Sequence, residues 1–171
     1  MRAGSQASER RPSVELIRQW LESVADPEIP VLTIGDLGVL QDVRWEDDRL
    51  VVTITPTYSG CPAMQTIRTD IVATLRARGV EPVQVLERHA PAWTTDWMSD
   101  EGKRKLREYG IAPPEGRPAS RAVLFGAPAQ PACPRCGSRE SEQLSEFGST
   151  ACKAHYRCKS CLEPFDYFKC I

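Results

Sequence analysis

The chain has 171 residues, enough for one ordinary domain and a small second unit, and its 22 Lys and Arg residues nearly balance its 23 Asp and Glu residues. This balance argues against a general nucleic-acid binder and a polybasic membrane anchor, and no apolar run is long enough to span a bilayer or to form a signal peptide. The sequence therefore predicts a cytoplasmic protein, in which seven cysteines are metal ligands or reactive thiols rather than disulfides.

The first part of the chain has the periodicities of a small α/β sandwich. Residues 1–12 are polar and are expected to form a disordered tail. The elements expected after it are a helix at 13–24, strands at 39–45 and 50–55, a helix at 63–78 and a strand at 82–87. The order α-β-β-α-β indicates an α/β (α+β) fold, with helices on one face of a mixed sheet.

One cysteine lies in the loop between the second expected strand and the second expected helix. Cys61 is followed by Pro62, which suits the first turn of a helix. At that position, unpaired backbone N–H groups and the positive end of the helix dipole favour a thiolate. A small buried residue that packs a corner of the fold has the same sequence pattern. Both interpretations of Cys61 are open on these residues alone.

Three carboxylates precede the first expected strand in a segment rich in Pro and Gly. Asp26 and Glu28 flank Pro27, and Asp36 follows in the same turn-rich stretch. One interpretation is a polar cluster beside the Cys61 loop. The other is that Asp26 and Asp36 only cap turns through local side-chain hydrogen bonds.

Two tryptophans stand out in the segment after the last expected strand. Trp93 and Trp97 precede a basic helix that Ser99 is expected to cap. Because Trp and Arg are enriched among the residues that dominate protein interfaces, this aromatic loop is a candidate docking surface for a partner protein. The alternative is that both rings close the bottom of the core.

The C-terminal part carries the most specific motif of the chain. Residues 112–132 are rich in Pro and are expected to form an extended linker, in which 122–125 can dock as a short strand. Two Cys-x-x-Cys turns follow, and together they present four thiolates to one tetrahedral ion. The expected metal ligands are Cys133, Cys136, Cys158 and Cys161. Residues 133–171 are therefore expected to form a zinc ribbon, with a rubredoxin-like iron site as the alternative.

A domain of this size buries little core, so the metal is expected to supply much of its folding free energy. A zinc ion with four sulfur ligands has no open position, and catalysis at this metal is not expected. Cys152, His155 and Cys170 have no assigned role at this point. Cys152 is open to several interpretations, as an alternative ligand, a residue that supports the ligands or a second reactive thiol.

These features together resemble a known family. Asp-Pro-Glu at 26–28, Asp-Leu-Gly at 36–38 and the loop at 55–64 resemble the SufT-like iron–sulfur assembly domain. The segments at 93–99 and 147–153 look like those of the PaaD-like proteins of the phenylacetyl-CoA epoxidase system, which join this domain to a C-terminal zinc ribbon. On this resemblance, the assembly domain with its Trp-rich extension is expected at 13–111.

The resemblance implies an accessory role in aerobic phenylacetate degradation. In that system a multicomponent oxygenase with a di-iron subunit epoxidises phenylacetyl-CoA, and its reductase carries flavin and an iron–sulfur cluster. A PaaD-like protein is implied to assist maturation, by delivering iron or an iron–sulfur cluster, rather than to catalyse. Carried over to this chain, Cys61 is the candidate thiol for transient iron or cluster binding, and Asp26 and Glu28 are its polar neighbours. The expected partners are the oxygenase and reductase subunits.

The residues themselves are compatible with this role. The sequence lacks the Glu-x-x-His pattern of di-iron helices, a Rossmann glycine fingerprint and the closely spaced cysteines of a permanent cluster. A single thiolate cannot complete the ligand set of a cluster, so a second protomer in a homodimer, or the client protein, is expected to contribute. The alternatives are a non-catalytic adaptor subunit of the oxygenase, or a thiol enzyme that uses Cys61 with His89 or His155 as its base.

Overall fold

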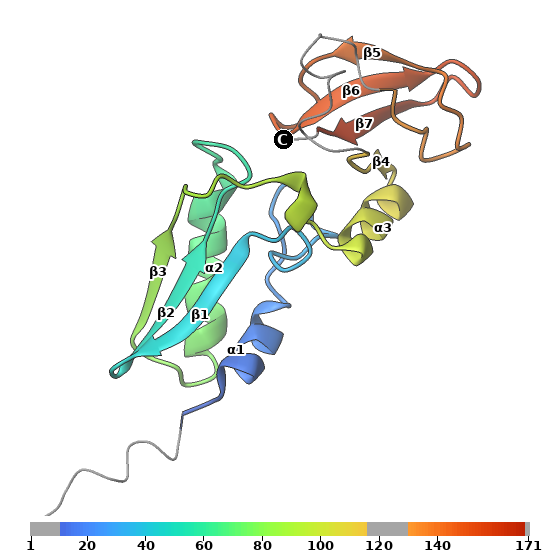
Figure 1. Cartoon of the computed structure of the whole chain (residues 1–171). Helices are drawn as coiled ribbons and strands as arrows, with labels where there is room; N and C mark the ends of the chain where they lie inside the picture. The colour runs from blue at the N-terminus through green and yellow to red at the C-terminus, as the bar shows by residue number, and fades with distance from the viewer. Residues whose placement is uncertain (1–10, 116–129, 170–171) are drawn as a thin grey trace, which may run out of the picture.

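The computed structural model describes residues 11–115 and 130–169. Most of the expected N-terminal tail, the strand expected at 122–125 and Cys170 lie outside the described residues. Within them, the chain forms a helix-and-sheet domain followed by a second sheet of short strands (Figure 1). No helix in the described ranges combines the length and the apolar character that crossing a bilayer requires.

The first unit has the predicted order α-β-β-α-β. Its elements are α1 (Val14–Leu21), β1 (Leu40–Glu46), β2 (Arg49–Ile54), α2 (Ala63–Arg76) and β3 (Val83–Glu87). Strands β1 and β2 are antiparallel, β2 and β3 are parallel, and α2 is the crossover between the parallel pair. Helices α1 and α2 share one buried core with this sheet (Figure 1). The predicted α+β class is confirmed.

Alternating apolar side chains hold α2 against the sheet. Leu50, Val52 and Ile54 are fully buried on β2, and Ile71 and Leu75 of α2 are fully buried in the same cluster. Burial of each such side chain stabilises the fold by about 1.5–3 kcal/mol. Because β2 and α2 are both fixed in this way, the two ends of the loop that joins them are fixed as well.

The segment after β3 folds back onto the first unit. It contains the short helix η2 (Thr95–Trp97) and helix α3 (Asp100–Tyr109). Ser99 caps α3 as predicted, because its hydroxyl accepts a hydrogen bond of 2.9 Å from the N–H of Gly102. The carboxylate of Asp36 accepts a hydrogen bond of 2.7 Å from the ammonium of Lys105, which ties α3 to the turn before β1.

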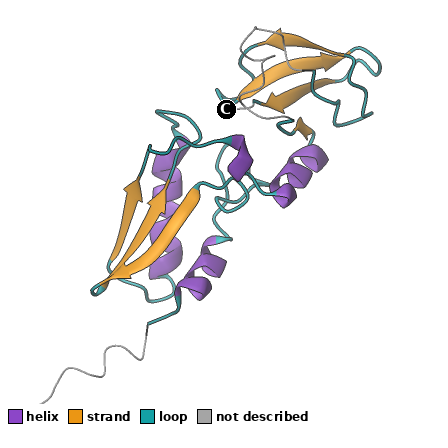
Figure 2. Cartoon of the chain, viewed as in Figure 1, coloured by secondary structure: helices purple, strands orange, loops and turns teal. Residues whose placement is uncertain are grey.

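The second unit is a four-stranded sheet in the order β4-β7-β6-β5. Its strands are β4 (Ile111–Ala112), β5 (Ser141–Ser145), β6 (Lys153–Cys158) and β7 (Pro164–Phe168). The described part of this unit contains strands and loops, whereas the helices lie in the first part of the chain (Figure 2). We call residues 130–169 the ribbon. Strand β4 pairs with β7, so the sheet of the ribbon already begins where a linker is expected from residue 112.

The ribbon packs directly against the first unit. Its own core consists mainly of aromatic residues of β6 and β7, whereas Cys152 and Phe168 are buried in the core cluster of the first unit. The ring of Phe168 lies 6.1 Å, centre to centre, from the ring of Trp93. Strand β4 leads from α3 directly into the ribbon sheet (Figure 1). The end of the ribbon that carries Cys152 therefore faces the first unit.

Candidate functional site

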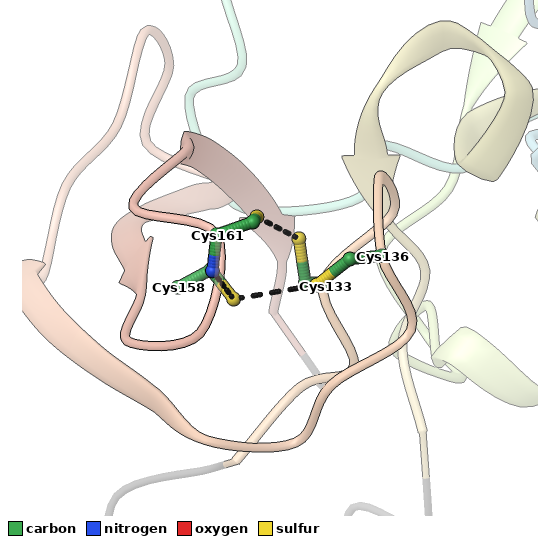
Figure 3. A group of neighbouring side chains, drawn as sticks. All are labelled: Cys133, Cys136, Cys158 and Cys161. Carbon is green, nitrogen blue, oxygen red and sulfur yellow. Dashed lines mark hydrogen bonds between the residues drawn. The ribbon is translucent and has the colours of Figure 1, made fainter.

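Four cysteine thiols meet at one end of the ribbon (Figure 3). The sulfur atoms of Cys133, Cys136, Cys158 and Cys161 all lie within 4.8 Å of one another. The sulfurs of Cys133 and Cys161 are 3.7 Å apart, and those of Cys136 and Cys158 are 3.6 Å apart. A tetrahedral zinc ion with Zn–S bonds of about 2.3 Å separates its sulfurs by about 3.8 Å. The four thiols therefore fit one tetrahedral ion without rearrangement, and the metal ligands predicted from the spacing are brought together.

The backbone of both turns prepares the thiols for a metal. The N–H of Cys161 points at the sulfur of Cys158 at 3.5 Å, and with the N–H of Ser160 it lowers the pKa of the Cys158 thiol to about 6. The first turn is closed by a hydrogen bond of 2.8 Å from the N–H of Gly137 to the carbonyl of Cys133. Gly137 has a φ of 77°, which a residue with a side chain adopts only under strain.

A second group of polar side chains surrounds Cys61, between β2 and α2. Cys61 is half-buried and packs against the core of the first unit. Its N–H donates a hydrogen bond of 3.3 Å to the carbonyl of Tyr58. The hydroxyl of Tyr58 and the N–H of Ala63 both hydrogen-bond to the sulfur. These contacts hold the thiol at the first turn of α2, the position that the sequence predicts.

The protonation state of Cys61 differs from the sequence prediction. Its place before a helix favours a thiolate, but burial raises the pKa of the Cys61 thiol above its ordinary value. The negative charges of Glu28 and Asp26 raise this pKa further, and the hydrogen bonds from Ala63 and Tyr58 do not compensate. The predicted thiolate is therefore wrong for the free protein. Cys61 is a protonated thiol at neutral pH and loses its proton when it binds a metal.

Asp26 and Glu28 lie close enough to Cys61 for their charges to act on its thiol. Asp26 also caps its own turn, because its Oδ1 accepts hydrogen bonds of 2.8 Å from the N–H groups of Glu28 and Ile29. Burial raises the pKa of Asp26 despite these bonds. Burial, together with the charge of Asp26, raises the pKa of Glu28. Asp26 thus combines the two roles that the sequence left as alternatives.

Asp36, the third carboxylate of the predicted cluster, serves α3 instead. It contacts Lys105 and Ser99, and its Oδ2 accepts a hydrogen bond of 3.0 Å from the N–H of Thr33. Although burial works in the other direction, the hydrogen bond from Lys105 lowers the pKa of Asp36 below its ordinary value. Asp36 is therefore an ionised anchor between the turn and the helix.

Two residues of the ribbon face the Cys61 loop, and sequence reasoning did not place them there. Cys152 is 5% exposed and belongs to the core cluster against which Cys61 packs. The charges of Glu28 and Asp26 act on the Cys152 thiol as they do on Cys61. The ammonium of Lys153, which is 3% exposed, lowers the pKa of both carboxylates. The available signal was the motif at 147–153, but it does not say which distant residues it contacts.

The two candidate docking tryptophans have different environments. Trp93 is 4% exposed, its Nε1–H donates a hydrogen bond of 2.8 Å to the carbonyl of Leu37, and its ring packs against Phe168. Its surface is therefore used within the chain, between the first unit and the ribbon, which differs from the expected docking role. Trp97 is only partly buried, and contact of Trp97 with a partner protein stays a prediction.

Neither histidine provides a base for Cys61. Nδ1 of His155 lies 3.2 Å from the carboxylate of Asp166 within the ribbon, and His89 pairs with Glu87 at 3.3 Å at the end of β3. Neither ring is among the groups that act on the Cys61 thiol. The thiol-enzyme alternative therefore lacks the partner that it requires.

Comparison with known proteins gives matches to both parts of the chain. Residues 15–85 match the family described as iron-sulfur cluster assembly protein, and residues 117–169 match the PaaD zinc beta ribbon domain. Over 160 residues the chain is 51% identical to an Escherichia coli protein named as the D component of 1,2-phenylacetyl-CoA epoxidase, and the alignment covers 94% of each chain. It is 37% identical over 94 residues to a Fe-S protein maturation auxiliary factor of Porphyromonas gingivalis, which covers 54% of this chain and 89% of that protein.

A solved structure matches the first unit. A domain of unknown function, DUF59, from Bacillus anthracis has a TM-score of 0.50 and 30% identity, and the match covers 54% of this chain and 89% of that chain. The resemblance inferred from the Asp-Pro-Glu segment, the Cys61 loop and the cysteine turns is thus confirmed over both parts of the chain.

Proposed function

Because the chain belongs to the PaaD family of phenylacetyl-CoA epoxidase proteins, we propose that it is an accessory maturation factor of a phenylacetyl-CoA epoxidase. In this role it holds iron or an iron–sulfur cluster briefly and passes it to an iron-containing subunit of the oxygenase or its reductase. It acts in phenylacetate catabolism and does not itself catalyse the epoxidation.

The observation that carries this proposal is the environment of Cys61. A thiol in a transient cargo site must bind iron and then release it, so it needs a partly accessible sulfur and few permanent ligands. Cys61 is half-buried and has a hydroxyl, a backbone N–H and two carboxylates around it. Among the described residues, the ribbon cysteines are the one group of three or more ligand side chains within 4.8 Å of each other. The Cys61 site is therefore incomplete without a further ligand.

The ribbon has a structural part in this function. Its four thiols fit zinc and leave no open coordination position, so we assign the ribbon metal as structural zinc. Zinc fixes the turns that close the ribbon, and the ribbon in turn packs on the first unit through Phe168 and Cys152. The metal thereby supports the surroundings of Cys61 from a distance.

Maturation assays in cells test the proposal. A strain that lacks this chain is complemented with wild type, with Cys61→Ser or with Cys170→Ser as a matched cysteine control. The iron and sulfide content of the purified oxygenase and reductase is then measured. We expect a loss of iron or cluster from one client with Cys61→Ser and normal content with Cys170→Ser. Full client content with Cys61→Ser would refute delivery through this thiol.

The name of the Escherichia coli relative favours a second candidate, a structural adaptor subunit of the epoxidase complex. In that case the chain stays bound to the oxygenase, and the partly buried Trp97 is one candidate contact. Purification of the active complex distinguishes the two functions. A fixed one-to-one content of this chain supports the adaptor, and a substoichiometric content supports a transient factor. Sedimentation of the isolated chain tests the predicted homodimer.

A further inference from the structure

Cys152 is not a spare ligand of the ribbon metal. The four ribbon sulfurs already form a complete tetrahedral set, and Cys152 lies outside it. Its side chain is buried in the core cluster of the first unit, together with Phe168, rather than in the core of the ribbon. Cys61 and Tyr58 pack against this same cluster. Two free thiols from opposite parts of the chain therefore border one junction.

The loop before β6 is built to place Cys152 at that junction. Its ends are joined by a hydrogen bond of 2.7 Å from the N–H of Gly148 to the carbonyl of Lys153. A side chain at Gly148 would bring its Cβ to 2.7 Å from Oδ1 of Asp166, so the tight loop requires glycine. The hydroxyl of Thr150 lies 3.0 Å from the sulfur of Cys152. The thiol is thus held by its own loop and not left there by loose packing.

The groups between the two thiols are polar, although the junction is buried. The hydroxyl of Tyr58 bonds to the sulfur of Cys61 and is also close enough to Cys152 for the two groups to interact. Asp26 and Glu28 act on both thiols. Burial of such groups is unfavourable compared with an apolar contact. A purely structural junction needs only the packing of Trp93 on Phe168, so these groups point to a ligand.

We propose that Cys152 and Lys153 of the ribbon complete the Cys61 site, so that one iron atom, alone or in a cluster, is bound by thiolates from both parts of a single chain. This inference rests on the proposed function and adds a ligand to it. It also replaces the second protomer, which a single thiol would need, with the chain's own ribbon.

The charges and protons of the site balance for such a ligand. Each thiol that forms a bond to iron releases one proton, and the carboxylates of Glu28 and Asp26 are next to both sulfurs to receive it. The buried ammonium of Lys153 offsets the negative charge that two thiolates bring into the junction. Two thiolates leave the remaining positions of the iron for sulfide or for ligands of the client, which permits transfer.

Cobalt(II) is a suitable probe, because thiolate-to-cobalt charge-transfer absorbance grows with the number of thiolate ligands. Full-length protein with its ribbon loaded with zinc is titrated with Co²⁺ without oxygen, for wild type, Cys61→Ser, Cys152→Ser and Cys170→Ser. We expect each of the first two variants to lose about half of the absorbance and to bind cobalt at least tenfold more weakly. Cys170→Ser is expected to match wild type.

Cys152→Ala provides a second variant, because it keeps an apolar group at a buried position and one zinc per chain verifies the ribbon. Loss of absorbance in both Cys152 variants supports the proposal. Wild-type absorbance and affinity in Cys152→Ala overturn it while Cys61→Ser still loses the signal, and the proposed function then stands alone. If Cys61→Ser also binds as wild type, both fail. Parallel additions of Fe²⁺ alone and of Fe²⁺ with sulfide distinguish a lone ion from a cluster, and either supports the proposal only if both cysteines are required.

Discussion

Removal of the ribbon metal is predicted to release the ribbon from the first unit. Structural zinc contributes about 10–16 kcal/mol to the folding of small zinc domains at neutral pH. That is comparable with the whole stability of an ordinary domain, about 5–15 kcal/mol. The ribbon's own core contains three buried aromatic side chains, Tyr156, Phe165 and Tyr167, each worth about 1.5–3 kcal/mol. We therefore expect the ribbon without zinc to unfold.

Trp93 reports this release. Its ring is 4% exposed and contacts Phe168, so water reaches it when the ribbon unfolds. The fluorescence emission of the protein is measured before and after a strong chelator, and the Trp93→Phe variant identifies the part of the signal that comes from Trp93. We expect that part to shift to longer wavelength and to return when zinc is restored. Complete loss of zinc with unchanged Trp93 emission would show that the ribbon folds and docks without its metal.

The remaining predictions concern the first unit. Gly38→Ala is expected to lower the free energy of unfolding more than Gly60→Ala, because both glycines have positive φ but only at Gly38 would a Cβ meet backbone, at 2.5 Å; equal denaturant midpoints for the two variants would contradict this. The lowered pKa of Asp36 adds stability that is present above its unfolded pKa and is lost as the pH falls through its folded pKa, so wild type should lose more stability in acid than Lys105→Met in pH-dependent urea melts, and parallel curves would refute the assignment. Asp26→Asn keeps the Oδ1 acceptor and removes a buried charge, so it should raise the free energy of unfolding at pH 7 while weakening cobalt binding; a destabilised variant would be evidence against the raised pKa.

Local patterns predicted the elements and the ribbon ligands well. The alternation along Leu50, Val52 and Ile54 and the stripe through Ile71 and Leu75 depend on neighbours in sequence, and they fixed β2 and α2. The two cysteine turns were recognisable for the same reason, since each turn holds both of its thiols within four residues. Strand β4 was not predictable, because two residues carry no periodicity and its partner lies more than fifty residues later.

The surroundings of Cys61 depended on tertiary contacts that no local pattern encodes. A helix start favours a thiolate, but burial and two carboxylates determine the outcome, and both arise from distant segments. Trp93 was expected either at an interface or in the core, and it lies between the two parts of the chain. Cys152 and Lys153 are adjacent to a zinc ribbon in sequence, yet they face the Cys61 loop because the ribbon packs by its far end.

The central claim is that Cys61 binds iron in transit, and metal analysis of protein isolated without oxygen tests it most directly. Zinc, iron and acid-labile sulfide are measured per chain for wild type, Cys61→Ser and Cys170→Ser. We predict one zinc in all three proteins and additional iron, with or without sulfide, only in wild type and Cys170→Ser. Equal iron in Cys61→Ser and wild type, or no iron in any of them after incubation with Fe²⁺ and sulfide, would contradict the claim.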